Sequence, residues 1–236
     1  MPTGPGSSSL PSDRPGGAAG LAVSDPAADV RGDLLAMTAG VLERGASRVA
    51  LVEAGDVVVS EHVALAAHDS DCRCVGLNLM SPPYSPTPAQ FAAWLGSFEL
   101  GLLVQVEGRV PAELRLPPQG SHGWCCALAA ARSAAGYREA VVSLWQKLHD
   151  LVMWLERESM RRGYYLSVGL VVGDCELCEL CDTSRLCCFP YVARPSMEAV
   201  GIDVAATCAA AGWTASTGAA ERNGAATALT GLVLVV

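Results

Sequence analysis

The apolar residues of the chain follow helical spacing in several separate stretches. Apolar positions recur every three to four residues from Ala28 to Glu43, which predicts a helix there. A longer stripe of the same kind predicts the main helix, from Tyr137 to Arg162. Gly163 follows that stripe, at the position where a left-handed C-cap favours a residue without a Cβ.

Two further helices are indicated by their ends. Thr87 can cap a helix whose first position is Pro88, and Gln90 can close a capping box with Thr87. This helix is expected to end near Gly96. The last predicted helix runs from Met197 to Ala211, just before another glycine.

Four stretches have the apolar, β-branched character of strands. Arg48 to Val59 predicts two short strands around the turn sequence Ala54-Gly55-Asp56. The other strands are expected at Leu100 to Val106, Tyr164 to Val172 and Leu232 to Val236. Helices that alternate with strands predict an α/β fold, a layered mixed sheet flanked by helices, with a cysteine-rich loop after a central strand.

The N-terminal residues differ in composition from the rest of the chain. Residues 1–27 are dominated by Pro, Gly, Ser and Ala, which cannot supply a hydrophobic core, so they are expected to form a disordered arm. Residues 28–236 are long enough for a single α/β domain, and 51% of all residues are apolar.

Charge and hydropathy exclude some functions. The chain has 16 basic and 24 acidic residues, a net charge of −8, which makes nucleic acid an unfavourable partner. No stretch of about 18 apolar residues predicts a membrane span. The start of the chain lacks the basic and apolar regions of a signal peptide, so a cytoplasmic location is expected. Ten cysteines in a reducing compartment favour metal binding or thiol chemistry over disulfides.

The densest group of cysteines follows the predicted strand that ends at Val172. Cys175, Cys178, Cys181 and Cys187 have the spacing C-x2-C-x2-C-x5-C. Gaps of two residues let successive thiolates turn inward on one tight loop, where they can hold three corners of an iron–sulfur cubane while the fourth cysteine completes it. Bacterial ferredoxins use a similar run. The spacing therefore predicts that these four cysteines bind one metal centre.

Zinc and metal-free thiols are the alternatives. Structural zinc sites more often combine two separated C-x2-C pairs, so three cysteines in one run favour a 4Fe–4S cluster while zinc stays open. Cysteines can also pack as small hydrophobic residues or act as redox thiols. The acidic residues interspersed here are unlike a core segment: Asp174, Glu176, Glu179 and Asp182.

Three segments resemble a known family. They are the cysteine run, the stretch from Ala193 to Val204 and the upstream stretch from Cys72 to Thr87. Together they are similar to a bacterial and archaeal family of predicted metal-binding proteins, domain of unknown function 2284. The resemblance covers most of the chain after about Val30. It implies metal binding through cysteines and implies no particular reaction.

The upstream segment departs from the family pattern. Ser81 stands before Pro82-Pro83-Tyr84 where the family is expected to have a cysteine. A serine hydroxyl is a poor ligand for a soft metal, so a second complete cluster is not expected. Cys72 and Cys74 are a possible second site, a redox pair or plain loop cysteines.

The other candidates have simpler explanations. Cys125, Cys126 and Cys208 lie in apolar or Ala-rich helical stretches, where packing is the better interpretation. Cys188 is adjacent to Cys187, and neighbouring side chains rarely reach one metal together.

Glu198 and Asp203 lie five residues apart in the family-like segment. They could serve a ligand or a proton transfer, but an acidic residue in the first turn of a helix explains them more simply.

Three functions from different classes remain. The first is an iron–sulfur protein that passes electrons to a redox partner protein or is accessory to a redox enzyme. The second is a zinc-stabilised domain that binds a partner. The third is an enzyme acting on a small substrate, which would need a pocket of convergent polar groups beside the cysteine loop. No specific reaction is supported, since nucleotide-binding and hydrolase motifs are absent from the sequence.

Overall fold

One four-stranded sheet organises the molecule. The computed structural model describes residues 26–63, 75–114, 116–117, 119, 124–213 and 225–235. The strands are β1 (Arg48–Glu53), β2 (Leu100–Val110), β3 (Val168–Leu170) and β4 (Ala225–Val235). Their order is β1-β2-β4-β3, and each neighbouring pair is antiparallel. β2 and β4 pair along their whole length and form the centre of the sheet.

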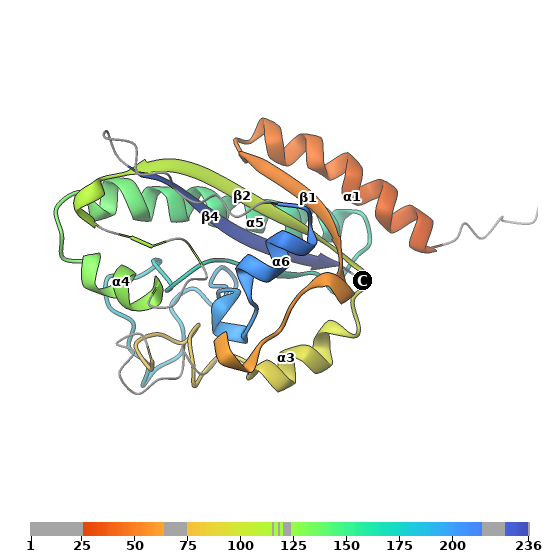
Figure 1. Cartoon of the computed structure of the whole chain (residues 1–236). Coiled ribbons are helices and arrows are strands. Elements are labelled where there is room, and N and C mark those ends of the chain that lie inside the picture. Colours follow the sequence, from red (N-terminus) through yellow and green to blue (C-terminus); the bar gives the residue numbers. More distant parts are fainter. Residues whose placement is uncertain are drawn as a thin grey trace, which may run out of the picture.

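Helices cover both faces of this sheet, α5 lying behind it and α6 in front (Figure 1). The helices that pack on one face are α1 (Pro26–Glu43) and α5 (Ser143–Arg161), and those on the other are α3 (Pro88–Leu95) and α6 (Val204–Ala210). Successive residues of β2 point to opposite faces: Leu102 and Val104 join the core under α1 and α5, and Leu103 joins the core under α3 and α6. The layered α/β fold expected from the sequence is confirmed.

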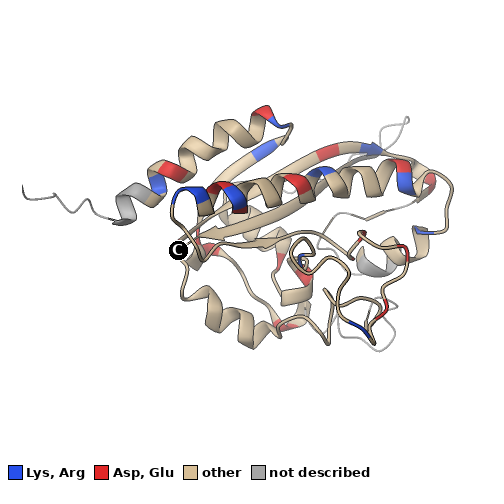
Figure 2. Cartoon of the chain, turned by 180° about the vertical axis from the view of Figure 1, so that it is seen from behind, with Lys and Arg blue, Asp and Glu red and all other residues tan. Residues whose placement is uncertain are grey.

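Helix α5 lies close against the sheet because glycines in the strands leave room for it. A Cβ on Gly169 would come within 2.6 Å of Val152 Cγ1, and a Cβ on Gly231 within 3.1 Å of Val152 Cγ2. The helix is preceded by a π-helical turn, η3 (Arg138–Val142), so the helix predicted from residue 137 to residue 162 is present but begins irregularly. Lys, Arg, Asp and Glu lie along α1 and α5 (Figure 2).

The predicted helix ends are present. Thr87 and Gln90 form the capping box of α3: Gln90 N donates to Thr87 Oγ1 at 3.3 Å, and Thr87 N donates to Gln90 Oε1 at 2.9 Å. Gly163 follows α5 with φ of 97°, in the left-handed region.

The second of the two strands predicted between residues 48 and 59 does not form. The turn sequence is a 3-10 helix, η1 (Ala54–Asp56), and only Val59 makes an isolated bridge, with Ile202. The backbone of Val58 is used elsewhere: its N–H donates to Thr207 Oγ1 at 3.1 Å, and its carbonyl accepts from Asp203 N at 2.8 Å. These bonds to the start of α6 replace a strand ladder.

The strand expected from residue 164 to residue 172 is shorter and lies elsewhere in the sheet. β3 spans three residues, and it is an edge strand because the longer β4 takes the central place beside β2. The prediction of a central strand before the cysteine loop was therefore wrong. Within the described residues, parallel pairing is limited to an isolated bridge just beyond β3, between Val171 and Ser196.

The helix predicted from residue 197 to residue 211 is divided into two. A 3-10 turn, η4 (Glu198–Val200), ends at Gly201, whose φ of 84° is left-handed. The carboxylate of Asp203 then caps α6 by accepting from Ala206 N at 2.9 Å. Asp203 is thus a helix cap.

The remaining elements are short: η2 (Ala112–Leu114) and α4 (Trp124–Ala131). Of the predicted disordered arm, residues 1–25 lie outside the described residues, and α1 begins at Pro26. Among the helices of the described residues, none is both long and apolar enough to cross a membrane.

Candidate metal centre

The cysteine loop, residues 173–192, leaves the sheet after β3. It turns first at Gly173, where φ is 61°. A Cβ at this position would come within 2.7 Å of Leu128 Cδ1 on α4. Both the left-handed backbone and the close contact require glycine, so this residue fixes the direction in which the loop departs.

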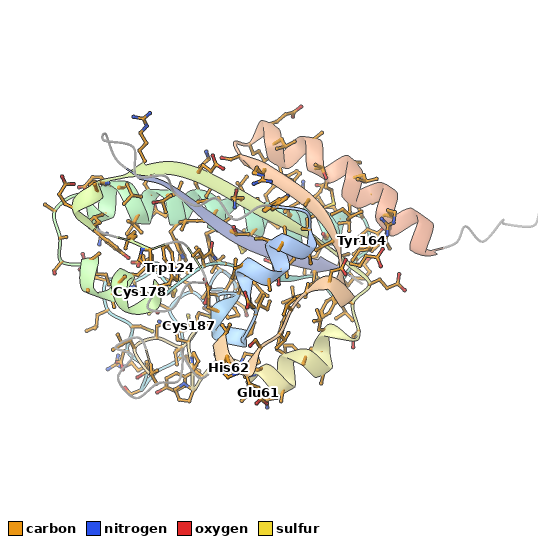
Figure 3. The ribbon with its side chains drawn as sticks, in the orientation of Figure 1. Glu61, His62, Trp124, Tyr164, Cys178 and Cys187 are labelled. Carbon is orange, nitrogen blue, oxygen red and sulfur yellow. The ribbon has the colours of Figure 1, made fainter. Side chains whose placement is uncertain are left out.

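The four predicted ligands come together in this loop. Cys175, Cys178, Cys181 and Cys187 all line one pocket of about 170 Å³, and Cys188 lines it too. Figure 3 shows Cys178 and Cys187 on the loop, on the same side of the molecule as α4. Residues 78–80 of the upstream segment close another side of the pocket. Among the described residues, no three His, Cys, Asp or Glu side chains already stand as the ligand set of one metal ion.

Two thiols of this pocket, Cys175 and Cys178, disfavour negative charge. Burial is the main cause that raises the pKa of Cys175 to about 11; a backbone hydrogen bond from Leu177 opposes the shift, and the neighbouring cysteines add to it because thiolates repel one another. Burial also raises the pKa of Cys178, with Cys188 as the next cause. A bound cation would offset this repulsion, and thiolates are the ligands that soft metals prefer. The donor set therefore fits an iron–sulfur cluster or zinc.

Hydrogen bonds to sulfur are already present. The backbone N–H of Phe189 donates to Cys187 Sγ at 3.4 Å. The thiols of Cys178 and Cys188 are hydrogen-bonded to each other. Cys188 is therefore part of the pocket. The sequence favoured Cys187 over Cys188 as a ligand, because adjacent side chains rarely reach one metal together.

A partly buried polar cluster supports the base of the loop on the side of α4. Arg132 Nη2 donates to Glu176 Oε1 at 2.9 Å, and Tyr137 Oη donates to the same oxygen at 3.0 Å. Arg132 also lies 3.9 Å from Asp174. Burial, followed by the charge of Glu176, raises the pKa of Tyr137, so this hydroxyl stays protonated and acts as a donor.

Ser81 has a structural role in place of the cysteine expected from the family pattern. Its hydroxyl donates to Asn78 Oδ1 at 3.1 Å and lies 3.5 Å from Asp174 Oδ1. Asn78 Nδ2 in turn donates to Asp174 at 3.3 Å. All three side chains are buried, so this network joins the upstream segment to the start of the cysteine loop.

Helix α5 holds both ends of the cysteine loop. Trp145 Nε1 donates to the carbonyl of Val172, just before the loop, at 3.0 Å. His149 Nε2 lies 2.9 Å from the carbonyl of Val192, at the other end. A carbonyl only accepts, so this nitrogen must carry the proton.

The same helix binds the chain beyond the loop. Arg194 Nε donates to both carboxylate oxygens of Glu156, at 3.0 and 2.9 Å, and Gly169 N donates to Glu156 Oε1 at 2.8 Å. Glu156 thus links β3 to the segment that follows the loop.

Glu198 is fully buried on the other face of the sheet. Gln119 Nε2 donates to Glu198 Oε1 at 3.0 Å and to the Thr230 carbonyl at 3.0 Å. Burial raises the pKa of this carboxyl. Its neighbours include the backbone of Gly173, so it supports the turn into the cysteine loop from below.

The other cysteines fall into two groups. Cys208 is buried in the core between the sheet and α6, which confirms the prediction that it is a packing residue. Cys72 and Cys74 lie outside the described residues, and of Cys125 and Cys126 only the helical backbone is described.

Sequence reasoning did not identify the residues that support the loop. These are Arg132, Tyr137, Trp145, His149 and Glu156. The signal available was weak: Glu156 is a charged residue directly beside the apolar stripe of α5, a position where a buried carboxylate needs a partner.

Comparison with known proteins gives one match. A family model described as predicted metal-binding protein, DUF2284, matches residues 50–235. No curated protein matches the chain, and no solved structure matches it.

Proposed function

Because the chain belongs to this family of predicted metal-binding proteins, we propose that Cys175, Cys178, Cys181 and Cys187 hold a metal centre, a 4Fe–4S cluster in preference to zinc. The observation that carries this proposal is the shared pocket: all four thiols line it. The pKa values of Cys175 and Cys178 are raised, and a metal cation is the partner that would compensate four thiolates on one loop.

The size of the pocket supports a cluster. A cavity needs a volume of roughly 10–15 Å³ to hold one water molecule, and a single metal ion is no larger than that. The volume of the thiol pocket, about 170 Å³, is therefore many times what a single ion needs. A zinc ion would draw its thiolates to about 2.3 Å from one point. The three-in-a-row spacing of Cys175, Cys178 and Cys181 also favours the cluster.

The proposed role is electron transfer in the cytoplasm, to a redox partner protein or as accessory to a redox enzyme. Three large apolar side chains of the loop and its end are almost fully exposed: Leu180 (87%), Leu186 (94%) and Tyr191 (88%). Two of them, Leu180 and Leu186, also line the thiol pocket. Exposed apolar patches of this kind are typical of protein interaction sites, and this one borders the proposed redox centre.

A zinc-stabilised domain that binds a partner is the second candidate function. The same exposed apolar residues favour it, because a partner could dock on a loop that zinc merely holds in shape. The two candidates differ in the metal and in redox activity.

Anaerobic purification distinguishes them. The cluster predicts a brown protein that contains iron and acid-labile sulfide, absorbs in the visible and bleaches with dithionite. A colourless protein with zinc and no sulfide would establish the second candidate instead. A protein with neither metal would overturn both.

Serine variants test the ligand assignment. Cys175→Ser, Cys178→Ser, Cys181→Ser and Cys187→Ser should each reduce the metal content sharply. Cys208→Ala is the matched control, because its side chain packs in the distant core. Cys188→Ser decides between the adjacent thiols: full metal content there, with loss in Cys187→Ser, supports the assignment, and the reverse result overturns it.

A further inference from the structure

A second pocket lies beside the thiol pocket and has a different character. Its volume is about 290 Å³, and its lining is mostly polar: Arg132, Tyr137, Arg138, Glu176, Cys178 and Glu179. Ligand pockets usually measure roughly 300–1,000 Å³, so this one suits a small molecule and is too small for a dinucleotide cofactor.

The two pockets share a wall. Leu177 and Cys178 line both of them. A molecule in the polar pocket would therefore lie against Cys178, one of the four proposed metal ligands. This is the position that a substrate or effector of the metal centre would occupy.

The inner part of the polar pocket is fixed before any ligand arrives. Arg132 Nη2 and Tyr137 Oη both donate to Glu176, which holds these three side chains together, while the buried Arg132 Nε makes no hydrogen bond within the described residues. Another part of the lining comes from η3, the π-helical turn that follows Tyr137 and carries Arg138 and Val142. π-Helical turns inside helices are frequent at functional sites. Side chains that are already held in place lose little conformational entropy when a ligand binds.

Two opposite charges at the pocket have no such partners. Arg138 and Glu179 are both exposed, and neither side chain makes a hydrogen bond or an ion pair with any residue in the described part of the chain. One comes from η3 and the other from the cysteine loop. They are thus the groups available to a ligand.

We propose that the polar pocket binds a small zwitterion of the α-amino-acid class, its carboxylate on Arg138 and its ammonium group on Glu179. The planar guanidinium suits a carboxylate, which it can bind through two parallel hydrogen bonds. A simple anion would bring its charge near Glu179, and a simple cation would bring its charge near Arg138. A molecule with both charges satisfies both groups.

This site goes beyond the metal centre, and it rests on the proposed function only for its position next to a metal ligand. The test is calorimetric titration of the anaerobically purified full-length protein with glycine, L-alanine and L-glutamate. Each is paired with the acid that lacks the amino group: acetate, propionate and glutarate. We expect saturable binding of at least one amino acid, at least about tenfold tighter than its paired acid. No saturable binding, or equal binding of the pair, would overturn the proposal.

Charge-removing variants locate the site. Arg138→Gln and Glu179→Gln should each weaken binding by at least about tenfold. Arg157→Gln and Glu139→Gln are matched controls, since both residues are exposed and neither lines the pocket. Unchanged binding in the first two variants would overturn the assignment.

Metal and sulfide analysis of the same samples separates this proposal from the proposed function. If the protein contains a cluster but binds no amino acid, only the proposal for the polar pocket is contradicted. If the protein is metal-free but binds an amino acid, only the proposal of a cluster is contradicted.

Discussion

The ring of His149 stacks on the ring of Trp145, with centroids 4.8 Å apart and planes 16° apart. The two residues are one helical turn apart on α5, and each holds one end of the cysteine loop through a backbone carbonyl, of Val172 or of Val192. Twenty residues that contain all five clustered cysteines are thus anchored at both ends to one helix. The positions of the thiols depend on this helix as much as on the loop itself.

Removing one of these anchors should loosen the metal centre. Trp145→Phe keeps an aromatic ring, smaller than the indole, but leaves the buried Val172 carbonyl without its donor, which costs about 1–3 kcal/mol. We expect a lower free energy of unfolding and faster loss of metal to a chelator, measured by denaturant titration and by absorbance. Trp154→Phe is the control, because that indole donates no hydrogen bond to any residue that the structure describes. Equal metal loss in the two variants would contradict the anchoring role.

The sequence predicted the parts of the fold that depend on local patterns. The stripe of α5, the capping box at Thr87 and the cysteine loop after a strand are each encoded within a few turns of chain. Pairing partners are not encoded in this way. Val57 to Val59 looks like a strand, yet the backbone of Val58 bonds to residues about 150 positions later. The edge position of β3 likewise depends on β4, more than fifty residues away.

The candidate site was predictable to a similar extent. Cysteine spacing identified four of the five cysteines that line one pocket, because the spacing itself reflects the shape of a tight loop. The supporting residues come from α4 and α5, and nothing local distinguishes Trp145 or His149 from other core residues of a helix. Their function appears only when the helix and the loop are placed together.

Glu156 should be the most sensitive charged residue of the scaffold. Its carboxylate is buried, accepts from Gly169 N and pairs with Arg194. Glu156→Gln leaves the guanidinium without its counter-charge, and we expect a loss of about 3 kcal/mol, at the lower end for buried pairs because Arg194 still reaches water.

Glu158→Gln is the matched control on the same helix. Glu158 pairs with Arg161 and Arg162 near the surface, so the expected loss is below about 1 kcal/mol. Chemical denaturation of both variants measures the difference. Similar losses would show that the Glu156–Arg194 pair contributes no more than a surface pair.

Replacing two glycines by alanine should change the free energy of unfolding in opposite directions. A Cβ at Gly169 would overlap Val152 and Glu156, at 2.6 and 2.8 Å, so Gly169→Ala should force α5 away from β3 and cost about 1–3 kcal/mol or more. Gly32 lies inside α1 with open space around it, so Gly32→Ala should stabilise by about 0.5–1 kcal/mol. Thermal unfolding of the two variants tests both signs.

The raised pKa of Cys175 predicts how metal binding depends on pH. In the metal-free protein the pKa of Cys175 is about 11, raised first by burial. The thiol is therefore protonated throughout the neutral range, yet a metal binds the thiolate. Each binding event must expel this proton, so the apparent affinity should rise with pH. The metal-free fold should show the reverse trend: because the folded state holds the proton more firmly than the unfolded chain, its stability is lost as pH rises toward 11.

Zinc is a suitable probe for this prediction whatever the resident metal is, since it needs no sulfide and is not oxidised. Competition between the metal-free protein and a chromophoric chelator, from about pH 6.5 to about pH 8.5, should show affinity rising at least about tenfold per pH unit for one expelled proton, and more if several thiols lose theirs. Cys175→Ser removes the most firmly held proton, so the slope should fall by about one. A slope near zero in the unsubstituted protein would mean that its thiols are already ionised, contrary to their burial in the loop.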